Sequence, residues 1–170
     1  MTQTRLAHDW YDEPLPPNVV MGPRSWLYSS YAFRHCRSEQ DPAVEIGRNS
    51  GIYLGSHFDL GPEGSVVIGD DCTLVSVILA TNGRVEIGNL VLIAHDVVIS
   101  GESTALPGRG RGGTHVRIGD NVWICTRSVL LDGAYIGDNS VVAAGVVVDF
   151  AVPSGSVVGG NPAAIVQSLR

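Results

Sequence analysis

The stretch that decides the fold runs from Val116 to Val148 and reads VRIGDNVWICTRSVLLDGAYIGDNSVVAAGVVV. Aliphatic residues occupy every sixth position within it: Ile118, Ile124, Leu130, Ile136, Val142 and Val148. Small or β-branched residues stand two positions before each of them: Val116, Val122, Ser128, Ala134, Ser140 and Val146. A period of six matches neither the turn of an α-helix nor the plain alternation of a long strand. The pattern therefore indicates a repeat of hexapeptides.

A hexapeptide repeat has a direct physical interpretation as a coil with three flat faces. Gly119, Gly137 and Gly145 interrupt the apolar pattern and mark turns between very short strands. Three hexads make one triangular coil of about eighteen residues, and stacked coils pair their strands in parallel at a spacing of about 4.8 Å. An ordinary β-sandwich is the alternative, but its strands recur at intervals of about 8–12 residues with variable turns. We therefore predict an all-β solenoid of about six coils.

The same spacing can be traced towards the N-terminus through four further coils. Their core positions are Met21, Leu27 and Phe33; Ile46, Ile52 and Phe58; Ile68, Leu74 and Ala80; and Ile87, Ile93 and Ile99. For the first of these coils a helix over residues 25–37 is the alternative, and we favour the coil because its six-residue spacing matches that of the next coil. Cys72 falls at an inward position, where we expect a buried apolar thiol.

The repeat divides the chain into three segments. Residues 1–18 contain no hexad and are expected to form an N-terminal arm. Residues 19–152 form the β-helix, and residues 153–170 form a short C-terminal cap. Within the cap, residues 163–169 could be a short helix or a strand that covers the open end of the solenoid.

The distances between corresponding core residues show where the coils are interrupted. Relative to a period of eighteen, successive coils from Met21 to Ile136 carry 7, 4, 1, 13 and 0 extra residues. Each interruption comes after the third face of its coil, so all the insertions should leave from one edge of the prism. The largest is the Gly-rich loop at residues 100–115, and such loops often line the binding face of a repeat protein.

Composition restricts the partners and the compartment. Of 170 residues only 16% are charged, and the net charge of −6 includes no basic block, so neither nucleic acid nor an anionic membrane is expected as a partner. No apolar run is long enough for a transmembrane helix, and the polar N-terminus does not resemble a signal peptide, so we expect a cytoplasmic protein. Three distant cysteines indicate neither a disulfide framework nor a zinc site.

Three segments resemble a known family. IGDNVWI (118–124), IGDNSVVAAGVVV (136–148) and VPSGSVVGGNPA (152–163) are similar to the C-terminal half of the hexapeptide-repeat acyltransferases, especially the branch of xenobiotic, maltose and polysaccharide O-acetyltransferases. The resemblance extends over residues 44–165. It implies a left-handed parallel β-helix that assembles as a homotrimer, with acetyl-CoA or another acyl-CoA as co-substrate in a groove between neighbouring coils. In that family a loop placed like residues 100–115 reaches across to the adjacent subunit.

The resemblance also implies where the acyl-CoA lies. Trp123 and the segment Gly160-Asn161-Pro162-Ala163 match stretches that usually run along it. We add Cys125, Arg127 and Gly145 as expected cofactor-binding residues. A nucleophilic Cys125 would need a thiol pKa lowered by a neighbour such as Arg127, so a turn residue without catalytic function is the simpler interpretation.

The general base is harder to identify, because the family usually places a His where this chain has Thr104. Acyl transfer needs a group that takes the proton of the acceptor and donors that stabilise the oxyanion. The candidates for the base are His95, Glu102 and His115. The residues expected to contact the acceptor are Asp59, Asn82, Asp96 and Thr104.

These observations favour a CoA-dependent acyltransferase that transfers an acetyl group to a hydroxyl or amine of a sugar or small metabolite. One alternative is a metal-dependent lyase or hydratase of the γ-carbonic-anhydrase type, with His57, His95 and His115 as ligands. The spacing of these histidines matches that family poorly, so no metal is expected. The other alternative is a homologue that has lost or changed the transfer activity, because the usual loop His is absent.

Overall fold

Short parallel strands wind around one axis and build three sheets. The computed structural model describes residues 5–101 and 115–169. The first sheet contains β1 (Val19–Met21), β3 (Val44–Ile46), β6 (Ser65–Ile68), β9 (Arg84–Ile87), β12 (His115–Ile118), β15 (Tyr135–Ile136) and β18 (Ala151–Val152). The second contains β2 (Trp26–Leu27), β4 (Gly51–Ile52), β7 (Thr73–Leu74), β10 (Leu92–Ile93), β13 (Trp123–Ile124), β16 (Val141–Val142), β19 (Ser156–Gly159) and β20 (Ala164–Ser168). The third contains β5 (His57–Leu60), β8 (Ile78–Thr81), β11 (Val98–Ser100), β14 (Val129–Leu131) and β17 (Val147–Val148).

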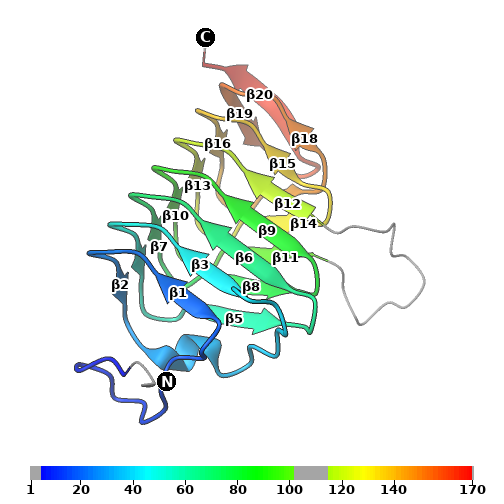
Figure 1. Cartoon of the computed structure of the whole chain (residues 1–170). Helices are drawn as coiled ribbons and strands as arrows, with labels where there is room; N and C mark the ends of the chain where they lie inside the picture. The colour runs from blue at the N-terminus through cyan, green and yellow to red at the C-terminus, as the bar shows by residue number, and fades with distance from the viewer. Residues whose placement is uncertain (1–4, 102–114, 170) are drawn as a thin grey trace.

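Successive coils stack on one another from the N-terminal to the C-terminal end of the molecule (Figure 1). Each full coil contributes one strand to each sheet, and every pairing within a sheet is parallel except that of β19 with β20. The winding is left-handed, so the predicted left-handed parallel β-helix is confirmed. No helix in the described ranges is both long and apolar enough to cross a bilayer.

The core consists of three columns of aliphatic side chains, one behind each sheet. The strand registers place these residues directly above one another: Ile46, Ile68, Ile87, Ile118, Ile136 and Val152; Ile52, Leu74, Ile93, Ile124, Val142 and Val158; and Phe58, Leu79, Ile99, Leu130 and Val148. All of them are buried. β-Branched and aliphatic residues suit this arrangement because their side chains pack well on a pleated surface.

The third coil departs from strict six-residue spacing. Phe58 and Ile99 both pair with Leu79, which is buried, whereas Ala80 pairs with the exposed Asp59. The prediction of Ala80 as the core residue was therefore wrong by one position. The turn between β7 and β8 is one residue shorter than its counterparts, and it reverses the chain through Ser76, whose φ is +53°.

The first coil keeps the predicted register on only two of its faces. Met21 pairs with Ile46 and Leu27 with Ile52, as expected. The third face is a 3₁₀ helix, η1 (Ser30–Phe33), so the prediction of a strand there was wrong. Phe33 nevertheless ends the third core column, because its ring packs on Phe58 with centroids 4.7 Å apart. The side chain of Ser29 caps η1 by accepting a hydrogen bond from the N–H of Tyr31.

The arm packs beneath this first coil. Asp9 accepts hydrogen bonds from the hydroxyl of Ser29 and from both the backbone N–H and the hydroxyl of Ser30, at 2.6–2.7 Å. Burial alone would raise the pKa of Asp9, but these hydrogen bonds outweigh burial and lower its pKa to about 2. Leu15 is buried in the core cluster. The described part of the arm therefore covers the N-terminal end of the stack.

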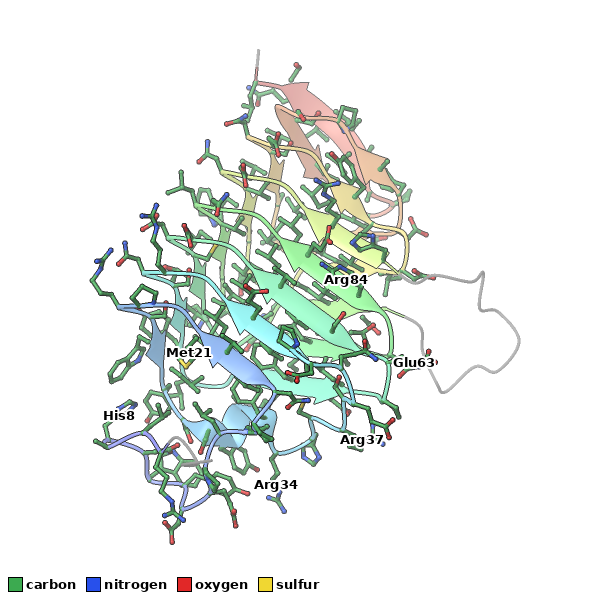
Figure 2. The ribbon with its side chains drawn as sticks, in the orientation of Figure 1. His8, Met21, Arg34, Arg37, Glu63 and Arg84 are labelled. Atoms are coloured by element: carbon green, nitrogen blue, oxygen red, sulfur yellow. The ribbon has the colours of Figure 1, made fainter. Side chains whose placement is uncertain are left out.

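Every insertion connects the third sheet to the first, so the prediction of a single insertion edge is confirmed. Arg37 and Glu63 belong to the first two insertions and lie on this side of the molecule (Figure 2). Most of the expected loop at residues 100–115 lies outside the described residues.

The corner between the first and second sheets carries a ladder of Asn and Asp side chains, which explains the repeated IGDN spelling. The N–H groups of Arg48, Asp70, Asn89 and Asp120 each donate to a side-chain oxygen one coil further on, at 2.7–2.8 Å. Gly119 is required here because a Cβ would collide with the Asp138 carboxylate above it.

The C-terminal end is formed by strands. β18 and β19 extend the first two sheets beyond β15 and β16, and β20 then turns back antiparallel to β19. Of the two possibilities left open for residues 163–169, the structure has the strand. β20 occupies the end of the second sheet.

The core register can be tested with two substitutions on one strand. Ile136 is fully buried, whereas its neighbour Tyr135 is 41% exposed. We expect Ile136→Asp to abolish folding, because it buries an unpaired carboxylate at a cost of several kcal/mol. Tyr135→Asp should stay folded, as judged by circular dichroism and thermal melting. Ile124→Asp and Val142→Asp should behave like Ile136→Asp, and soluble, folded protein from two of these three variants would contradict the register.

Candidate functional site

The edge between the second and third sheets consists of short turns stacked directly on one another. We call it the short-turn edge and define it by residues 53–56, 75–77, 94–97, 125–128 and 143–146, together with residues 160–163, the β19–β20 turn that leaves the same end of the second sheet. The edge between the third and first sheets, which carries the insertions, is the insertion edge. The two edges lie at opposite ends of the third sheet, whose strands are two to four residues long. At about 3.3 Å per residue, roughly 10 Å separates them.

Hydrogen bonds join each turn of the short-turn edge to the turn below it. The N–H of Arg127 donates to the carbonyl of His95 at 3.0 Å, and the N–H of Gly145 donates to the carbonyl of Thr126 at 3.0 Å. The Thr126 hydroxyl also donates to the His95 carbonyl at 2.7 Å. The turn that contains His95 is thus held by two bonds from the next coil.

In the four-residue turns 53–56, 94–97, 125–128 and 143–146, the third residue adopts a left-handed backbone conformation. φ is +60° at Asp96, +59° at Arg127 and +71° at Gly145. Glycine adopts this conformation freely, whereas other residues do so at a cost of about 1–2 kcal/mol. Backbone strain of this kind concentrates at functional sites.

The second residue of three consecutive four-residue turns has a backbone N–H group that is not used in a hydrogen bond. Within the residues that the structure describes, the backbone N–H groups of His95, Thr126 and Ala144 make no hydrogen bond. They belong to consecutive coils, so they form a row spaced by about 4.8 Å. Oriented N–H groups of this kind can bind the oxygen atoms of an extended ligand or stabilise an oxyanion.

The structure brings most of the predicted site residues together at the short-turn edge. The residues found there are His95, Asp96, Cys125, Arg127, Gly145, Gly160, Asn161 and Pro162. Trp123 lies on the outer face of β13, two residues before its turn, and is 50% exposed. An open groove of about 330 Å³ runs beside it towards the corner between the first and second sheets, away from the short-turn edge, and is lined by Leu90, Leu92, Asn121, Val141 and Leu169.

The cysteines are unsuited to nucleophilic chemistry. Burial raises the pKa of the Cys125 thiol. Burial likewise raises the pKa of Cys72, which is almost fully enclosed, as its inward position predicted. A thiol rather than a thiolate at neutral pH is a poor nucleophile, so the structure favours the interpretation of Cys125 as a turn residue.

His115 lies at the other edge, at the start of β12. Its Nε2 is 3.2 Å from Oε2 of Glu86, and Arg84 donates to the other carboxylate oxygen at 2.7 Å. The hydrogen bond from Arg84 is the main cause that lowers the pKa of Glu86, and the charges of His115 and Arg117 act in the same direction against the opposing effect of burial. Glu86 is therefore a carboxylate that can hold the ring of His115.

Asp59 and Asn82 also belong to the insertion edge and already have structural partners. Asp59 forms an ion pair with Arg37 at 3.1 Å, and the Asn82 side-chain oxygen accepts the N–H of Glu63 at 3.0 Å. Glu102 and Thr104 lie outside the described residues. Within one chain, the structure thus separates His95 and Asp96 from His115, Asp59 and Asn82.

Two partners of the site were missed by sequence reasoning. Glu86 and Thr126 act through cross-coil contacts with His115 and His95. The repeat itself could have indicated Glu86, because equal hexad positions in successive coils put residues 86 and 117 side by side. The hydroxyl of Thr126 gave no such signal, since its contact depends on the shape of the turn.

The three histidines of the metal hypothesis lie far apart in the fold. His57 is on β5, His95 is in the turn before β11, and His115 is on β12. Across residues 5–101 and 115–169, no three His, Cys, Asp or Glu side chains gather as a metal-ligand set. The donor set of a single chain therefore does not fit a zinc site.

Comparison with known proteins identifies the repeat. Residues 115–149 match the family model described as bacterial transferase hexapeptide (six repeats). The galactoside O-acetyltransferase of Escherichia coli K12 is 29% identical over 153 residues, which cover 89% of this chain and 64% of that protein. The chain thus spans slightly less than two thirds of the length of this curated relative.

Solved structures show the same fold. A hexapeptide transferase family protein from Anaplasma phagocytophilum has a TM-score of 0.64 at 21% identity, covering 89% of this chain and 84% of that one. A variant of an N-acyltransferase from Bacillus cereus, solved with dTDP and coenzyme A, has a TM-score of 0.61 at 15% identity with the same coverage. Together with the predicted and observed hexads, these matches show that the chain has the hexapeptide-repeat fold of these transferases.

Proposed function

We propose that the protein is a CoA-dependent acyltransferase that transfers an acetyl group to a hydroxyl or amine of a sugar or small metabolite. The observation that carries this proposal is the short-turn edge, where the turns of consecutive coils present a row of unused backbone donors. The galactoside O-acetyltransferase of E. coli and the CoA-bound N-acyltransferase of B. cereus support the reaction class.

An extended co-substrate fits this edge chemically. The backbone N–H groups of Thr126 and Ala144 would donate to the amide and thioester oxygens of the acyl-CoA, and the guanidinium of Arg127 would pair with a phosphate. Gly145 has no side chain to block a close approach to the backbone. The absence of a Cβ at Gly160 gives the same access one coil further on.

His95 is the base that this arrangement favours. Its backbone is fixed by Thr126 and Arg127, and its exposed ring lies on the same edge as the proposed co-substrate. Histidine changes its charge near neutral pH, which suits a general base. The imidazole would take the proton of the acceptor as the acceptor oxygen or nitrogen attacks the thioester carbonyl, and the oxyanion would face the turn N–H groups.

Cytoplasmic localisation remains part of this proposal.

We further infer a homotrimer, supported by the outer face of the third sheet. The outward column of that sheet is apolar along four coils, with Ile78, Val98, Val129 and Val147 in register. Ile78 and Val147 are 40% and 43% exposed in the single chain, which leaves a continuous apolar stripe in contact with water. Such a stripe is typical of a subunit interface.

A trimer with its third sheets facing the axis would bring the two edges of neighbouring subunits together. The insertion edge of one subunit would then lie next to the short-turn edge of another. His115 of one subunit, held by Glu86, would then lie in one shared site with His95 and Asp96 of the neighbouring subunit. Asp59, Asn82, Glu102 and Thr104 would join the acceptor side of this shared site.

Binding of the co-substrate tests the proposal directly. Acetyl-CoA at about one hundred times its Kd should stabilise the protein by about 2.7 kcal/mol, seen as a higher melting temperature. Arg127→Ala should weaken binding about tenfold in isothermal titration, because one phosphate contact is lost. Arg48→Ala, at the corner between the first and second sheets, is the matched control and should bind normally. No binding by the wild-type protein, or equal losses in both variants, would refute the proposed groove.

Removal of the base should separate catalysis from binding. We expect His95→Ala to lower kcat by about 10²–10⁴-fold with acceptors found in a screen, while the affinity for acetyl-CoA stays nearly unchanged. Release of free CoA thiol measures the rate. His115→Ala and Glu102→Gln are the next candidates. Near-normal turnover in all three variants would show that another group takes the proton.

The oligomer can be tested on the outer face of the third sheet. Light scattering should give about 54 kDa for the wild-type protein, three times the chain mass of 18.0 kDa. Ile78→Asp should give a folded monomer, because the carboxylate would be buried at the interface. Tyr135→Asp, equally exposed but on the first sheet, should remain trimeric. A monomeric wild-type protein would rule out the shared site.

A further inference from the structure

A pocket of about 170 Å³ opens at the N-terminal end of the short-turn edge. It lies between the first two coils, with Tyr28 and Tyr31 contributed by the first coil and Tyr53 and His57 by the second. Trp10, from the arm, forms the remaining wall. The family resemblance and the proposed co-substrate groove account for none of these residues.

The aromatic walls hold one another in place. The ring centroids of Trp10 and Tyr31 are 5.4 Å apart, and those of Tyr31 and His57 are 5.8 Å apart in an edge-on arrangement. The hydrogen bonds of Asp9 to Ser29 and Ser30 anchor the arm next to Trp10. The pocket is therefore formed before any ligand binds, as small-molecule sites usually are.

The lining determines the kind of ligand. Among the described residues, no Lys, Arg, Asp or Glu side chain lines the pocket. The Ser29 hydroxyl donates to Asp9, and the Ser56 hydroxyl accepts the N–H of Val77, so both have partners. A charged group would lose its hydration here without gaining an opposite charge. A flat, neutral ring would instead stack on the aromatic walls.

The volume agrees with a single ring. A dry apolar cavity of about 150 Å³ in another protein holds benzene. A pocket of about 170 Å³ thus accommodates one six-membered aromatic ring with a small linker.

The pocket is connected to the proposed base through the stacked turns. A side chain at Gly55 would collide with Ser76, so the turn of the second coil lies against that of the third. The Ser76 hydroxyl in turn donates to Asp96, next to His95, at 2.9 Å. Two coil spacings of about 4.8 Å put the pocket and His95 about 10 Å apart along the edge.

We propose that this pocket, which we call the aromatic pocket, anchors the acceptor by a neutral aromatic ring whose acylated hydroxyl or amine lies about 10 Å away, the distance of two coil spacings. The inference rests on the proposed acyltransferase function and names the class of acceptor that the site takes. The co-substrate occupies the C-terminal part of the short-turn edge, and the acceptor occupies its N-terminal end.

The first experiment measures binding without co-substrate. In saturation-transfer NMR, 6-phenylhexan-1-ol should bind, and its phenyl protons should receive the strongest transfer. Hexan-1-ol, which lacks the ring, and 6-(4-carboxyphenyl)hexan-1-ol, whose charge lies on the ring, should bind at least about tenfold more weakly. Tyr53→Ala should reduce binding of the phenyl probe about tenfold, whereas Tyr135→Ala, a tyrosine of equal exposure (42% and 41%) on the first sheet, should not. Trp10→Ala provides a second variant outside the β-helix.

The second experiment measures transfer from acetyl-CoA. We expect kcat/KM for 6-phenylhexan-1-ol to exceed that for hexan-1-ol and for 2-phenylethanol, whose hydroxyl is too close to its ring. Tyr53→Ala should abolish this preference while the affinity for acetyl-CoA stays unchanged.

The outcomes separate the two proposals. Selective binding of the phenyl probe by a protein that neither binds acetyl-CoA nor transfers its acetyl group would leave the aromatic pocket as a binding site and refute the acyltransferase. Acetyl-CoA binding and transfer without a preference for the ring, or a preference that survives in both Tyr53→Ala and Trp10→Ala, would overturn the pocket and leave the proposed function intact.

Discussion

The structure depends on one constraint: each coil satisfies its backbone hydrogen bonds only through the coils directly above and below it. A shift in register would break the ladder and also move the aliphatic columns out of alignment. Extra residues are therefore tolerated only where the chain leaves the stack, and in this protein that place is the insertion edge. The third coil shows how tightly the constraint acts, because its turn loses one residue so that Leu79 can enter the core column.

The same constraint makes the short-turn edge a suitable place for a ligand. Turns of only three or four residues present their backbone at a nearly constant spacing, so a row of donors arises without any dedicated side chain. Left-handed conformations at Asp96 and Arg127 reverse the chain within a few residues, and the N–H groups of His95 and Thr126 just before them make no hydrogen bond within the described residues. The proposed binding of acyl-CoA at this edge thus depends largely on backbone groups, with the side chains of His95 and Arg127 added to them.

The corner of the Asn and Asp ladder, the outer face of the third sheet and the N-terminal arm each have a different role. The Asn and Asp ladder stabilises the corner between the first and second sheets, and the apolar face of the third sheet suits contact between subunits. The N-terminal arm does more than cover the first coil, because Asp9 holds it where Trp10 can form a wall of the aromatic pocket. A single edge of the prism could in this way carry co-substrate, base and acceptor in order.

The sequence alone determined the β-helix, its register except on the third faces of the first and third coils, and the position of the insertions, because a six-residue period leaves only one way to bury the aliphatic residues. It also predicted Trp123, Gly145 and Gly160 as cofactor-binding residues, and this assignment stays a prediction. Only the tertiary structure decided that His95 and His115 lie at opposite ends of the third sheet, since nearness in sequence to a loop does not give the direction of a strand. It alone placed Phe33 on a helical turn that still fills the core, because packing on Phe58 requires the ring and not a strand. The aromatic pocket likewise depends on contacts between the arm and two coils, which have no periodicity for a sequence to reveal.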